Sequence, residues 1–585
     1  MYDLVIRDAL IADGTGSAAR SGDIAVKDGM IAEIGKVTAA ARETLRADGA
    51  LATPGFIDVH THYDGQFLWD DRMDPSFSHG VTTAIAGNCG VGFAPVRPEH
   101  RRRLAELMEG VEDIPGAVLE EGLAWDWESF PDYLNRLGAR RYAMDVAAHL
   151  THAPLRVFVM GERALNHEPA SPEDVERMAA LVREAMAAGA VGVSAARLLE
   201  HLSTKGDHVP GTFASEDELL ALAKAMGESG KGVFQIIPKG FGGTTAYTNI
   251  GREGRLAEQA LLLRLARESG RPVTFSLTEF ASDPQDRRLM VAASEAAHQE
   301  GLRLHPQVAA RGVGIMCTLD AYHIFILRPS YRAIAHLPLA ERAQAMRDPE
   351  RRRAILAEAD DPGVYASDAN LGPLIPRLQA NIGRTYPLSL PLDYEPGPQA
   401  RVDALAKAAG KTPEAFIYDH YAAGDGTNCN MSLYHNYVDG VLDELREVLL
   451  NPHVISGLGD GGAHMRMICD ASMPTFQLAF WGRDRTRGER MPVEAIVRKL
   501  SGDCADLYGL SDRGVLQVGR RADLNLIDFD NLALDMPRVV KDLPTGAPRL
   551  LQGARGYLAT LVNGVATRLE GEDTGARPGR LARPN

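Results

Sequence analysis

The 585-residue sequence is poor in cysteine and has no long apolar run. Such sparse, odd-numbered use of cysteine argues against a disulfide framework and is typical of reduced thiols in the cytoplasm. No apolar stretch approaches the roughly 20 residues that cross a bilayer, and the first residues lack the segments of a signal peptide. We therefore expect a cytoplasmic protein without a membrane partner. The five cysteines are Cys89, Cys317, Cys429, Cys469 and Cys504.

Basic residues are also too few for a nucleic-acid-binding protein. The chain has 63 Lys and Arg against 78 Asp and Glu, which gives a net charge of −15. A charge of this sign repels phosphate backbones, so nucleic acid is excluded as the expected partner. Hydrophobic residues make up 45% and charged residues 24%, as in ordinary globular proteins. The length predicts more than one domain.

Both ends of the chain show β patterns. Asp28-Gly29 separates two short apolar runs near the N-terminus, and Asn563-Gly564 follows another apolar run near the C-terminus. Both dipeptides tolerate the positive φ that a tight hairpin turn requires. The two ends therefore predict one small β-sandwich domain, followed by a loose tail.

The middle of the chain alternates strand and helix patterns, which is typical of a parallel α/β sheet. Ser171-Pro172 predicts a helix start, Gly189 its end, and Ser215 with Glu218 a capping box. Eight strands are expected, the number that a closed (β/α)₈ TIM barrel requires. Their carboxyl ends are residues 60–62, 86–89, 149–152, 194–197, 235–238, 276–279, 305–307 and 459–464.

The expected fold class is therefore α/β, a TIM barrel plus a terminal β-sandwich. The connection between strands seven and eight is far longer than an ordinary loop, and it lies at the catalytic face of a barrel, so it should shape the substrate pocket. The predicted boundaries are 1–53 and 512–570 for the β-sandwich, 54–511 for the barrel, about 310–450 for the long insertion, and 571–585 for the tail.

His60 and His62 carry the first chemical signal. Residues two apart in a strand point to the same side, so both imidazoles enter the barrel mouth. Two neutral ring nitrogens at that spacing can hold one divalent metal ion. The alternative is a pair of packed or solvated histidines, and the position directly after residues 54–58 favours the metal site.

Several motifs carry a resemblance to a known family. Residues 54–62, Pro-Gly-Phe-Ile-Asp-Val-His-Thr-His, resemble the amidohydrolase superfamily. Residues 80–83 and 87–90, Gly-Val-Thr-Thr and Gly-Asn-Cys-Gly, are similar to its N-acyl-D-amino-acid deacylase (D-aminoacylase) branch. Residues 457–464 look like the strand-eight motif of that branch, and 519–524 like its return to the terminal domain. These motifs span nearly the whole chain.

The resemblance implies a role for each matching residue. His60, His62 and Asp460 match the residues that hold the first metal ion, and Asp460 also matches the aspartate that moves the proton. Cys89 matches a ligating cysteine, and a thiolate is a good zinc ligand. Taken alone, Cys89 is equally well explained as a small buried residue.

Four further residues are expected near the substrate. His152 matches a strand-three histidine close to the substrate, or it is a structural, hydrogen-bonding histidine. His464 is expected to orient the substrate or Asp460. Arg197 and Arg311 lie near strand ends and offer a cation for a substrate carboxylate, although most arginines are surface residues.

The sequence departs from the family at strands five and six, where the family usually offers histidines. Residues 235–239 and 276–279 contain none, and Arg197 ends strand four where some relatives have a carboxylated lysine. We therefore expect one Zn²⁺ and do not favour a second. Lys239 and Glu279 are the alternative ligands, each more often a surface charge.

The resemblance implies a hydrolase of carbon–nitrogen bonds other than peptide bonds, with a small-molecule amide as substrate. The expected reaction is deacylation of an N-acyl-D-amino acid or a similar linear amide by metal-activated water, with Asp460 as general base and acid. Hydrolysis of a cyclic amide or another C–N bond is the alternative reaction. A non-catalytic scaffold is the alternative class, which the missing histidines support and the retained His60, His62 and Asp460 oppose. Formation of a homo-oligomer is left open.

Overall fold

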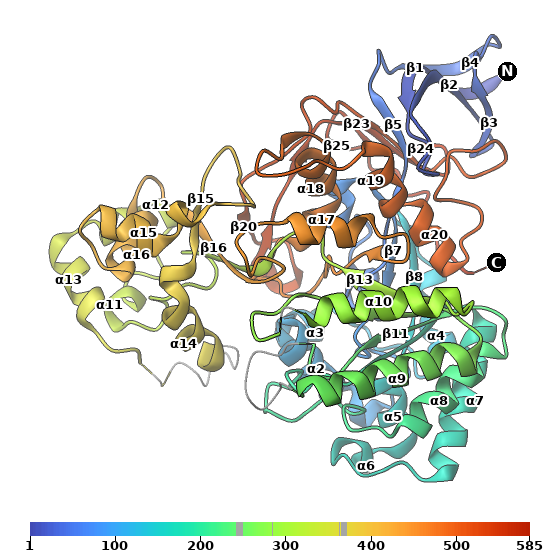
Figure 1. Ribbon diagram of the computed structural model, residues 1–585. Helices are drawn as coiled ribbons and strands as arrows, with labels where there is room; N and C mark the ends of the chain where they lie inside the picture. Colours follow the sequence, from blue (N-terminus) through green and yellow to red (C-terminus); the bar gives the residue numbers. More distant parts are fainter. Residues whose placement is uncertain (242–249, 284, 362, 364–370, 585) are drawn as a thin grey trace.

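The protein is a mixed α/β molecule in this computed structural model. Figure 1 shows three regions: a β-rich region built from both termini, an α/β region in the middle, and a helical lobe that projects to one side. None of the described helices is long and apolar enough to cross a membrane. The structure describes residues 1–241, 250–283, 285–361, 363 and 371–584; residues 362 and 364–370 of the expected insertion, and residue 585 of the expected tail, lie outside this description.

Strands from both ends of the chain form one nine-stranded sheet. They are β1 (Tyr2–Ile11), β2 (Arg20–Lys27), β3 (Met30–Gly35), β4 (Ala41–Arg46), β5 (Leu51–Pro54), β18 (Leu524–Ile527), β23 (Tyr557–Val562), β24 (Val565–Leu569) and β25 (Glu572–Asp573). The antiparallel pairing of β5 with β18 joins the two halves. Both hairpin predictions are confirmed: Asp28 and Gly29 turn between β2 and β3, and Asn563 and Gly564 between β23 and β24, all with positive φ.

The middle of the chain contributes short parallel strands in two hydrogen-bonded sets. In spatial order the sets are β6 (Phe56–Asp58), β7 (Val81–Ala86) and β8 (Asp145–Ala148), and then β9 (Leu150–Thr151), β10 (Gly192–Ala196), β11 (Val233–Ile237), β12 (Val273–Ser276), β13 (Leu304–Val308) and β17 (Ile455–Ser456). Only His149 separates β8 from β9. Beyond β6 and β17, Thr61 forms a parallel bridge with Gly461. Six of the expected strand ends contain residues of a parallel strand, whereas β6 and β17 end before residues 60–62 and 459–464, where Thr61 and Gly461 form the bridge.

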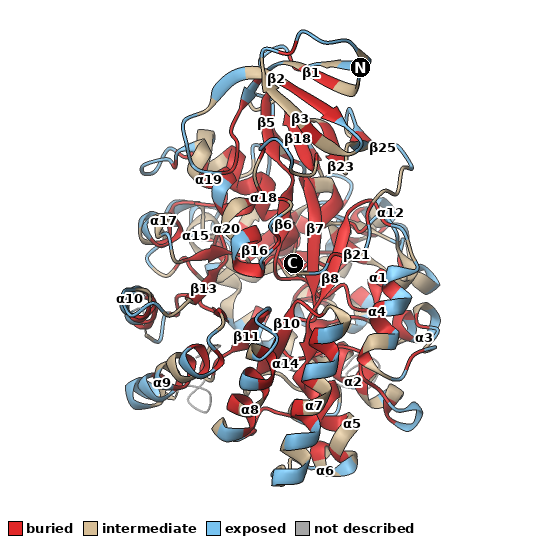
Figure 2. Ribbon diagram, turned by 90° about the vertical axis from the view of Figure 1, so that its right-hand side faces the viewer, coloured by how far each residue is buried: buried red, intermediate tan, exposed pale blue. Residues whose placement is uncertain are grey.

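Helices follow most of these strands and pack on their outer side. Figure 2 shows the exposed faces of these helices turned outward, while the strands between them are buried. The prediction for α7 (Pro172–Ala188) is confirmed, because Ser171 caps this helix and Gly189 ends it at φ 107°. These helices are α2 (Arg101–Glu112), α5 (His152–Met160), α7 (Pro172–Ala188), α8 (Glu216–Gly227), α9 (Gly251–Ser269), α10 (Asp286–Gln299), α19 (Val493–Leu500) and α20 (Gly502–Tyr508).

The capping box predicted at the start of α8 is only half present. Ser215 accepts a hydrogen bond from the backbone N–H of Glu218, as expected for an N-cap. The Glu218 carboxylate does not return to Ser215, because it binds His152 and Arg156 instead.

Most of the chain between β13 and β17 forms the projecting lobe, drawn mainly in yellow in Figure 1, whereas α17 (Asp443–Leu450) lies on the main body and pairs with α10 through Glu444 and Arg288. The antiparallel sheet of the lobe has the order β14 (Val313–Thr318), β16 (Cys429–His435) and β15 (Tyr386–Leu388). Tyr322, Phe325, Ile375 and Tyr418 belong to a hydrophobic core that is separate from the main one. Its helices are α11 (Pro329–Arg332), α12 (Leu339–Met346), α13 (Pro349–Ala357), α14 (Leu371–Asn381), α15 (Val402–Ala408) and α16 (Pro413–Ala422).

The prediction of a loose C-terminal tail is wrong. Gly579 exchanges two backbone hydrogen bonds with Tyr142, at 2.9 and 3.2 Å, and Ala582 donates to Val146. A Cβ atom on Gly579 would lie 2.1 Å from the Met144 carbonyl oxygen, so only glycine fits this approach. The composition of the last residues indicated a flexible segment. Its backbone nevertheless forms hydrogen bonds with Tyr142, which precedes β8, and with Val146 in β8.

Candidate metal centre and active site

His60 and His62 lie just beyond the end of β6 and are both 1% exposed. The backbone of Thr61 between them is held on two sides, because its N–H donates to Ile85 and it bridges to Gly461. This keeps the segment extended, so that the two rings lie on one side with their centroids 5.6 Å apart. The expected common direction of the two histidines is present.

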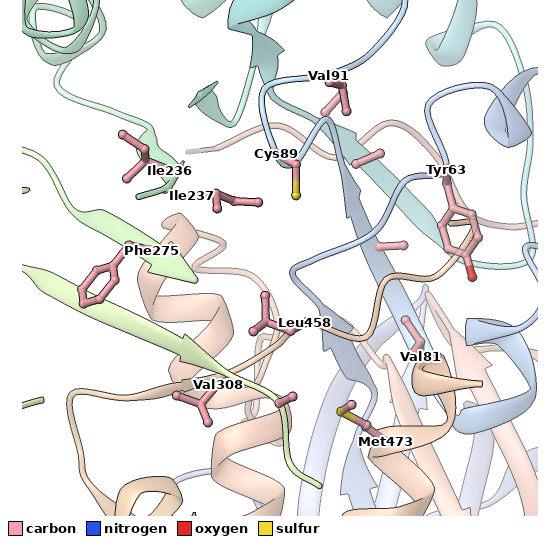
Figure 3. Packing of buried hydrophobic residues seen from close by; sticks show 14 of the residues in the cluster. Tyr63, Val81, Cys89, Val91, Ile236, Ile237, Phe275, Val308, Leu458 and Met473 are labelled. Atoms are coloured by element: carbon pink, nitrogen blue, oxygen red, sulfur yellow. The ribbon is translucent and has the colours of Figure 1, made fainter. Parts of the chain in front are cut away.

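Cys89 approaches both histidines from the turn after β7. Its Sγ atom lies 3.2 Å from His60 Nε2 and 3.6 Å from His62 Nε2. The residue has a positive φ of 57°, and its backbone N–H donates to Gln235 Oε1 at 3.0 Å. Figure 3 shows its sulfur directed toward Ile237 and Leu458, which line the same cavity. One ligand atom from each of His60, His62 and Cys89 lies within 4.8 Å of the others.

Asp460 completes the cluster from the segment after β17. Its Oδ1 atom lies 3.3 Å from His60 Nε2 and 3.8 Å from His62 Nε2. Like Cys89, it has a positive φ, 46°. Burial raises the pKa of Asp460 to about 6, while nearby His464 opposes the shift. The structure therefore brings together all four residues that the sequence placed at the metal.

Two residues not identified from the sequence lie beside the Nδ1 atoms of the histidines, and one of them makes a hydrogen bond. Gln307, on β13, places Oε1 2.7 Å from His60 Nδ1. Glu112, at the end of α2, places Oε1 3.4 Å from His62 Nδ1, without a hydrogen bond between the two atoms. Because an amide oxygen only accepts, His60 carries its proton on Nδ1 and presents a free lone pair at Nε2. A hydrogen-bonded partner such as Gln307 fixes the ring orientation of a metal-binding histidine.

The electrostatics of the cluster fit a bound cation. Burial lowers the pKa of His60 to about 4, so its ring is neutral at pH 7. Burial, with contributions from Glu112 and Asp460, raises the pKa of the Cys89 thiol well above its usual value. Burial and the Asp460 charge likewise raise the pKa of Glu112. A divalent ion would oppose the shifts of Cys89 and Glu112, because it favours the thiolate and the carboxylate forms.

The cluster lines a cavity of about 500 Å³. His464 lines it as well, and its Nε2 lies 3.8 Å from Glu112 Oε2. The projecting lobe supplies part of the wall, as expected for the long connection between strands seven and eight. The wall residues from the lobe are Val313, Gly314, Ile315, Leu374, Arg377, Tyr434 and His435.

Three residues expected near the substrate lie outside the described lining of this cavity. His152 is 1% exposed and its Nε2 lies 2.8 Å from Glu218, which corresponds to the structural alternative. Arg197 is 6% exposed and binds both carboxylate oxygens of Glu258. A guanidinium that a buried carboxylate already neutralises is a poor partner for a substrate anion.

Arg311, like Arg197, is buried and paired with a carboxylate. It is 1% exposed, its Nη2 lies 2.8 Å from Asp470 Oδ1, and its guanidinium stacks on Tyr394 at 4.5 Å. Asp470 lines the cavity and Arg311 is not among the described lining residues, so Arg311 lies behind Asp470 in the cavity wall. The pairing of Arg311 with Asp470 joins segments far apart in the sequence, and no local pattern predicts it.

The alternative ligands also lie away from the cluster. Glu279 lies 3.5 Å from Arg287, and neither Glu279 nor Lys239 is among the described residues that line the cavity. At the positions expected for histidines, the cavity wall holds Ile237 from β11 and Ser276 from β12.

This fold and this cluster define a known class of protein. A model of the amidohydrolase family matches residues 43–567, and the chain belongs to that family. Curated relatives from Alcaligenes xylosoxydans xylosoxydans are an N-acyl-D-aspartate deacylase, 27% identical over 100% of this chain and 95% of the relative, and an N-acyl-D-glutamate deacylase, 26% identical over 99% and 96%. A D-aminoacylase from the same organism is 30% identical over 53% of this chain, and the match spans 58% of that relative.

Solved structures show the same fold. A D-aminoacylase described as defining a novel subset of amidohydrolases has a TM-score of 0.64 and 22% identity, covering 99% of both chains. The N-acyl-D-glutamate deacylase from Bordetella bronchiseptica, complexed with zinc and a phosphonate inhibitor, has a TM-score of 0.63 and 22% identity, covering 100% of this chain and 99% of that one.

Proposed function

We propose that this protein is a metal-dependent deacylase that cleaves the linear amide bond of N-acyl-D-amino acids or closely similar substrates. One observation carries the proposal: His60, His62, Cys89 and Asp460 meet in one cavity at the carboxyl ends of the parallel strands. Active sites of (β/α)₈ enzymes lie at this end. The full-length relatives that deacylate acidic N-acyl-D-amino acids support the substrate class.

We also propose that the parallel strands form one closed barrel, with the domain boundaries given below. The two sets of parallel strands and the bridge between Thr61 and Gly461 support one closed (β/α)₈ barrel over residues 54–511. Residues 1–53 and 512–570 then form the terminal β domain, and about 310–450 the insertion. Five described cysteines, all free and buried, support a reducing compartment such as the cytoplasm.

We further propose that the cluster holds one Zn²⁺. The donors are His60 Nε2, His62 Nε2, Cys89 Sγ and an Asp460 carboxylate oxygen, a nitrogen, sulfur and oxygen set that suits zinc. When bound, the ion supplies Lewis acidity, which makes water nucleophilic near neutral pH and polarises an amide carbonyl. The absence of histidines at the ends of β11 and β12 supports one ion.

The residues of the chain itself position the groups and move the proton. Gln307 holds the His60 imidazole with Nε2 toward the cluster, and the Glu112 carboxylate lies beside the Nδ1 atom of His62. The Asp460 carboxylate accepts a proton from the attacking water and delivers it to the leaving amide nitrogen.

The test is a substrate panel on zinc-loaded protein with the bound metal measured. The panel contains N-acetyl-D- and N-acetyl-L-amino acids and cyclic amides. We expect hydrolysis of the linear D-substrates and its loss, together with the metal, in His60→Ala and His62→Ala. His336→Gln, an exposed histidine in the lobe, is the control and should retain both. Faster hydrolysis of cyclic amides would contradict the linear-amide assignment, and full activity without metal would contradict the site.

A further inference from the structure

The segment that carries Asp460 has little stiffness of its own. Four of the six residues from 457 to 462 are glycine, the residue with the largest backbone freedom. Such a segment holds a side chain in place only where its backbone is fastened to neighbours. One fastening is the carbonyl oxygen of Gly461, which accepts a hydrogen bond from the His62 backbone N–H at 2.8 Å. The remaining fastenings therefore decide how precisely Asp460 keeps its 3.3 Å distance from His60 Nε2.

The end of α2 supplies fastenings on the other side of Asp460. The backbone N–H of His464 donates to the carbonyl oxygen of Glu112, the last residue of α2. Two residues further on, the backbone N–H of Arg466 donates to Asp113 Oδ2 at 3.4 Å. Consecutive residues at the end of one helix thus hold the Asp460 segment at two positions.

The Asp113 carboxylate is a junction between distant parts of the chain. Asp113 is 2% exposed and has a left-handed φ of 50°, which ends α2. Its Oδ1 atom accepts hydrogen bonds from Arg466 Nη2 and from Tyr322 Oη, both at 2.9 Å. A buried carboxylate needs such partners to replace the water it has lost, so its position depends on both of them.

The Tyr322 hydroxyl brings the projecting lobe into this junction. Tyr322 is 1% exposed and belongs to the separate core of the lobe, and the guanidinium of Arg466 lies 4.5 Å from the centroid of its ring. Close by, the backbone N–H of Met316 on β14 donates to the carbonyl oxygen of Met467 at 2.7 Å. The lobe, the Asp460 segment and α2 therefore meet around Asp113.

We propose that Asp113 is a positioning residue, whose carboxylate fastens the Asp460 segment to α2 and couples the metal centre to the lobe. The proposal rests on the proposed function, because it takes the cluster as the metal centre. A displaced lobe removes the Tyr322 hydroxyl from Asp113, loosens Arg466 and so lets Asp460 move away from His60. Coupling of this kind is reciprocal, so a bound ion also stabilises the docked lobe.

Asp113→Asn tests the carboxylate without disturbing the turn, because Asn also tolerates a left-handed backbone. The full chain is loaded with Co²⁺, and the visible absorption of the ion is followed after an excess of chelator is added. We expect the absorption spectrum to change, because it reports the ligand geometry, and Co²⁺ to leave about tenfold faster, the lower end of the effect of residues that orient metal ligands. Asp207→Asn, at an exposed position, is the control and should behave as the parent.

Tyr322→Phe tests the coupling to the lobe, because it removes only the donor that the lobe supplies. We expect Co²⁺ to leave faster than from the parent, by less than in Asp113→Asn, since one neutral donor is lost. Tyr331→Phe is the matched control: Tyr331 lies in the same core, is also 1% exposed, and donates to the Leu319 carbonyl oxygen at 3.1 Å. Equal effects of the two tyrosine variants would overturn the coupling, because general weakening of the lobe would explain both.

Hydrogen exchange measures the reverse direction of the coupling. The backbone N–H of Met316 joins the lobe to the Asp460 segment. We expect Zn²⁺ to slow exchange at this amide in the parent, and to slow it less in Asp113→Asn. Exchange at Met316 that is the same with and without metal in the parent would overturn the coupling.

Failure of this proposal is distinguishable from failure of the proposed function. A parental Co²⁺ spectrum and release rate in Asp113→Asn would overturn the positioning role even if linear amides are hydrolysed. Release of Co²⁺ that depends on Asp113 and Tyr322, without hydrolysis of any amide, would uphold the positioning role and reject the deacylase.

Discussion

The Nδ1 atom of His60 lies 2.7 Å from Oε1 of Gln307, a residue on the seventh strand position. This contact fixes the ring so that Nε2 faces Cys89 at 3.2 Å and Asp460 at 3.3 Å. A neutral side chain outside the proposed ligand set thus determines where one of the proposed ligands points.

The first prediction concerns this contact. Gln307→Leu replaces the amide by an apolar side chain of similar size and removes the acceptor, so His60 loses its orientation and some of its basicity. We expect zinc affinity to fall about 10- to 100-fold, as for other orienting partners. A competition titration with a coloured chelator measures it, and Gln299→Leu, at an exposed position on α10, is the control. Parental affinity in Gln307→Leu would show that the contact does not orient the ligand.

The second prediction concerns Cys89. A thiolate bound to Co²⁺ gives a near-ultraviolet charge-transfer band that oxygen and nitrogen ligands do not give. We expect the Co²⁺-loaded parent to show this band and Cys89→Ser to lack it. Cys504→Ser is the control, because that thiol donates to the Lys499 carbonyl in the core rather than to the cluster. A band that persists in Cys89→Ser would remove Cys89 from the ligand set.

The third prediction concerns the join between the strands and the terminal region. Asp145 on β8 lies 2.6 Å from Arg513 and 3.0 Å from Arg521, and it accepts a hydrogen bond from the backbone of Arg580. Arg513 also pairs with Asp512, and Arg521 with Asp523, so Asp145→Asn removes one of two carboxylates from each guanidinium. We expect a loss of about 2 kcal/mol of unfolding free energy, the effect of losing charged hydrogen bonds.

Urea unfolding measures the loss at Asp145. The control is Asp126→Asn, because Asp126 pairs with Arg136 with both side chains about half exposed. That variant should change the free energy of unfolding by about 0–1 kcal/mol. Equal effects for the two substitutions would contradict the account of Asp145.

The fourth prediction concerns pH and His79. Its ring lies 2.9 Å from Thr475 Oγ1 and from the Gln552 carbonyl oxygen, and burial lowers its pKa from 6.5 to about 3. Between these two values the unfolded state binds a proton that the folded state does not, so lowering the pH destabilises the fold. This contribution is complete above pH 6.5 and declines toward pH 3.

His79→Gln should lack this part of the pH dependence. We expect the stability advantage of the parent over the variant to shrink below pH 6.5, by up to about 1.4 kcal/mol per pH unit for one proton. Urea unfolding at pH 7.5, 6.5 and 5.5 tests it. A constant difference across that series would show that His79 does not titrate as a buried neutral ring.

Sequence patterns predicted the elements whose signals are local. The Asp28-Gly29 turn, the Ser171 cap and the parallel strand positions follow from neighbouring residues, and the structure has each of them. His60 and His62 were identifiable because their spacing of two within an extended segment makes both point one way.

Contacts between distant segments were not predictable in this way. Glu112 ends an ordinary helix, and nothing in its neighbourhood indicates that it faces His62. Arg197 was expected to meet a substrate, but Glu258 on α9 neutralises it. The pairing partner of a charge is set by the tertiary fold, which spacing and composition do not encode.

The most direct test of the account is the turnover of Asp460→Asn with bound metal measured on the same sample. Asn keeps the shape of the side chain and an oxygen for the ion, but it accepts no proton at neutral pH. The account predicts a fall in kcat on N-acetyl-D-amino acids of about 10²–10⁴-fold with zinc still bound. Near-parental kcat with the metal retained would show that Asp460 is not the residue that moves the proton.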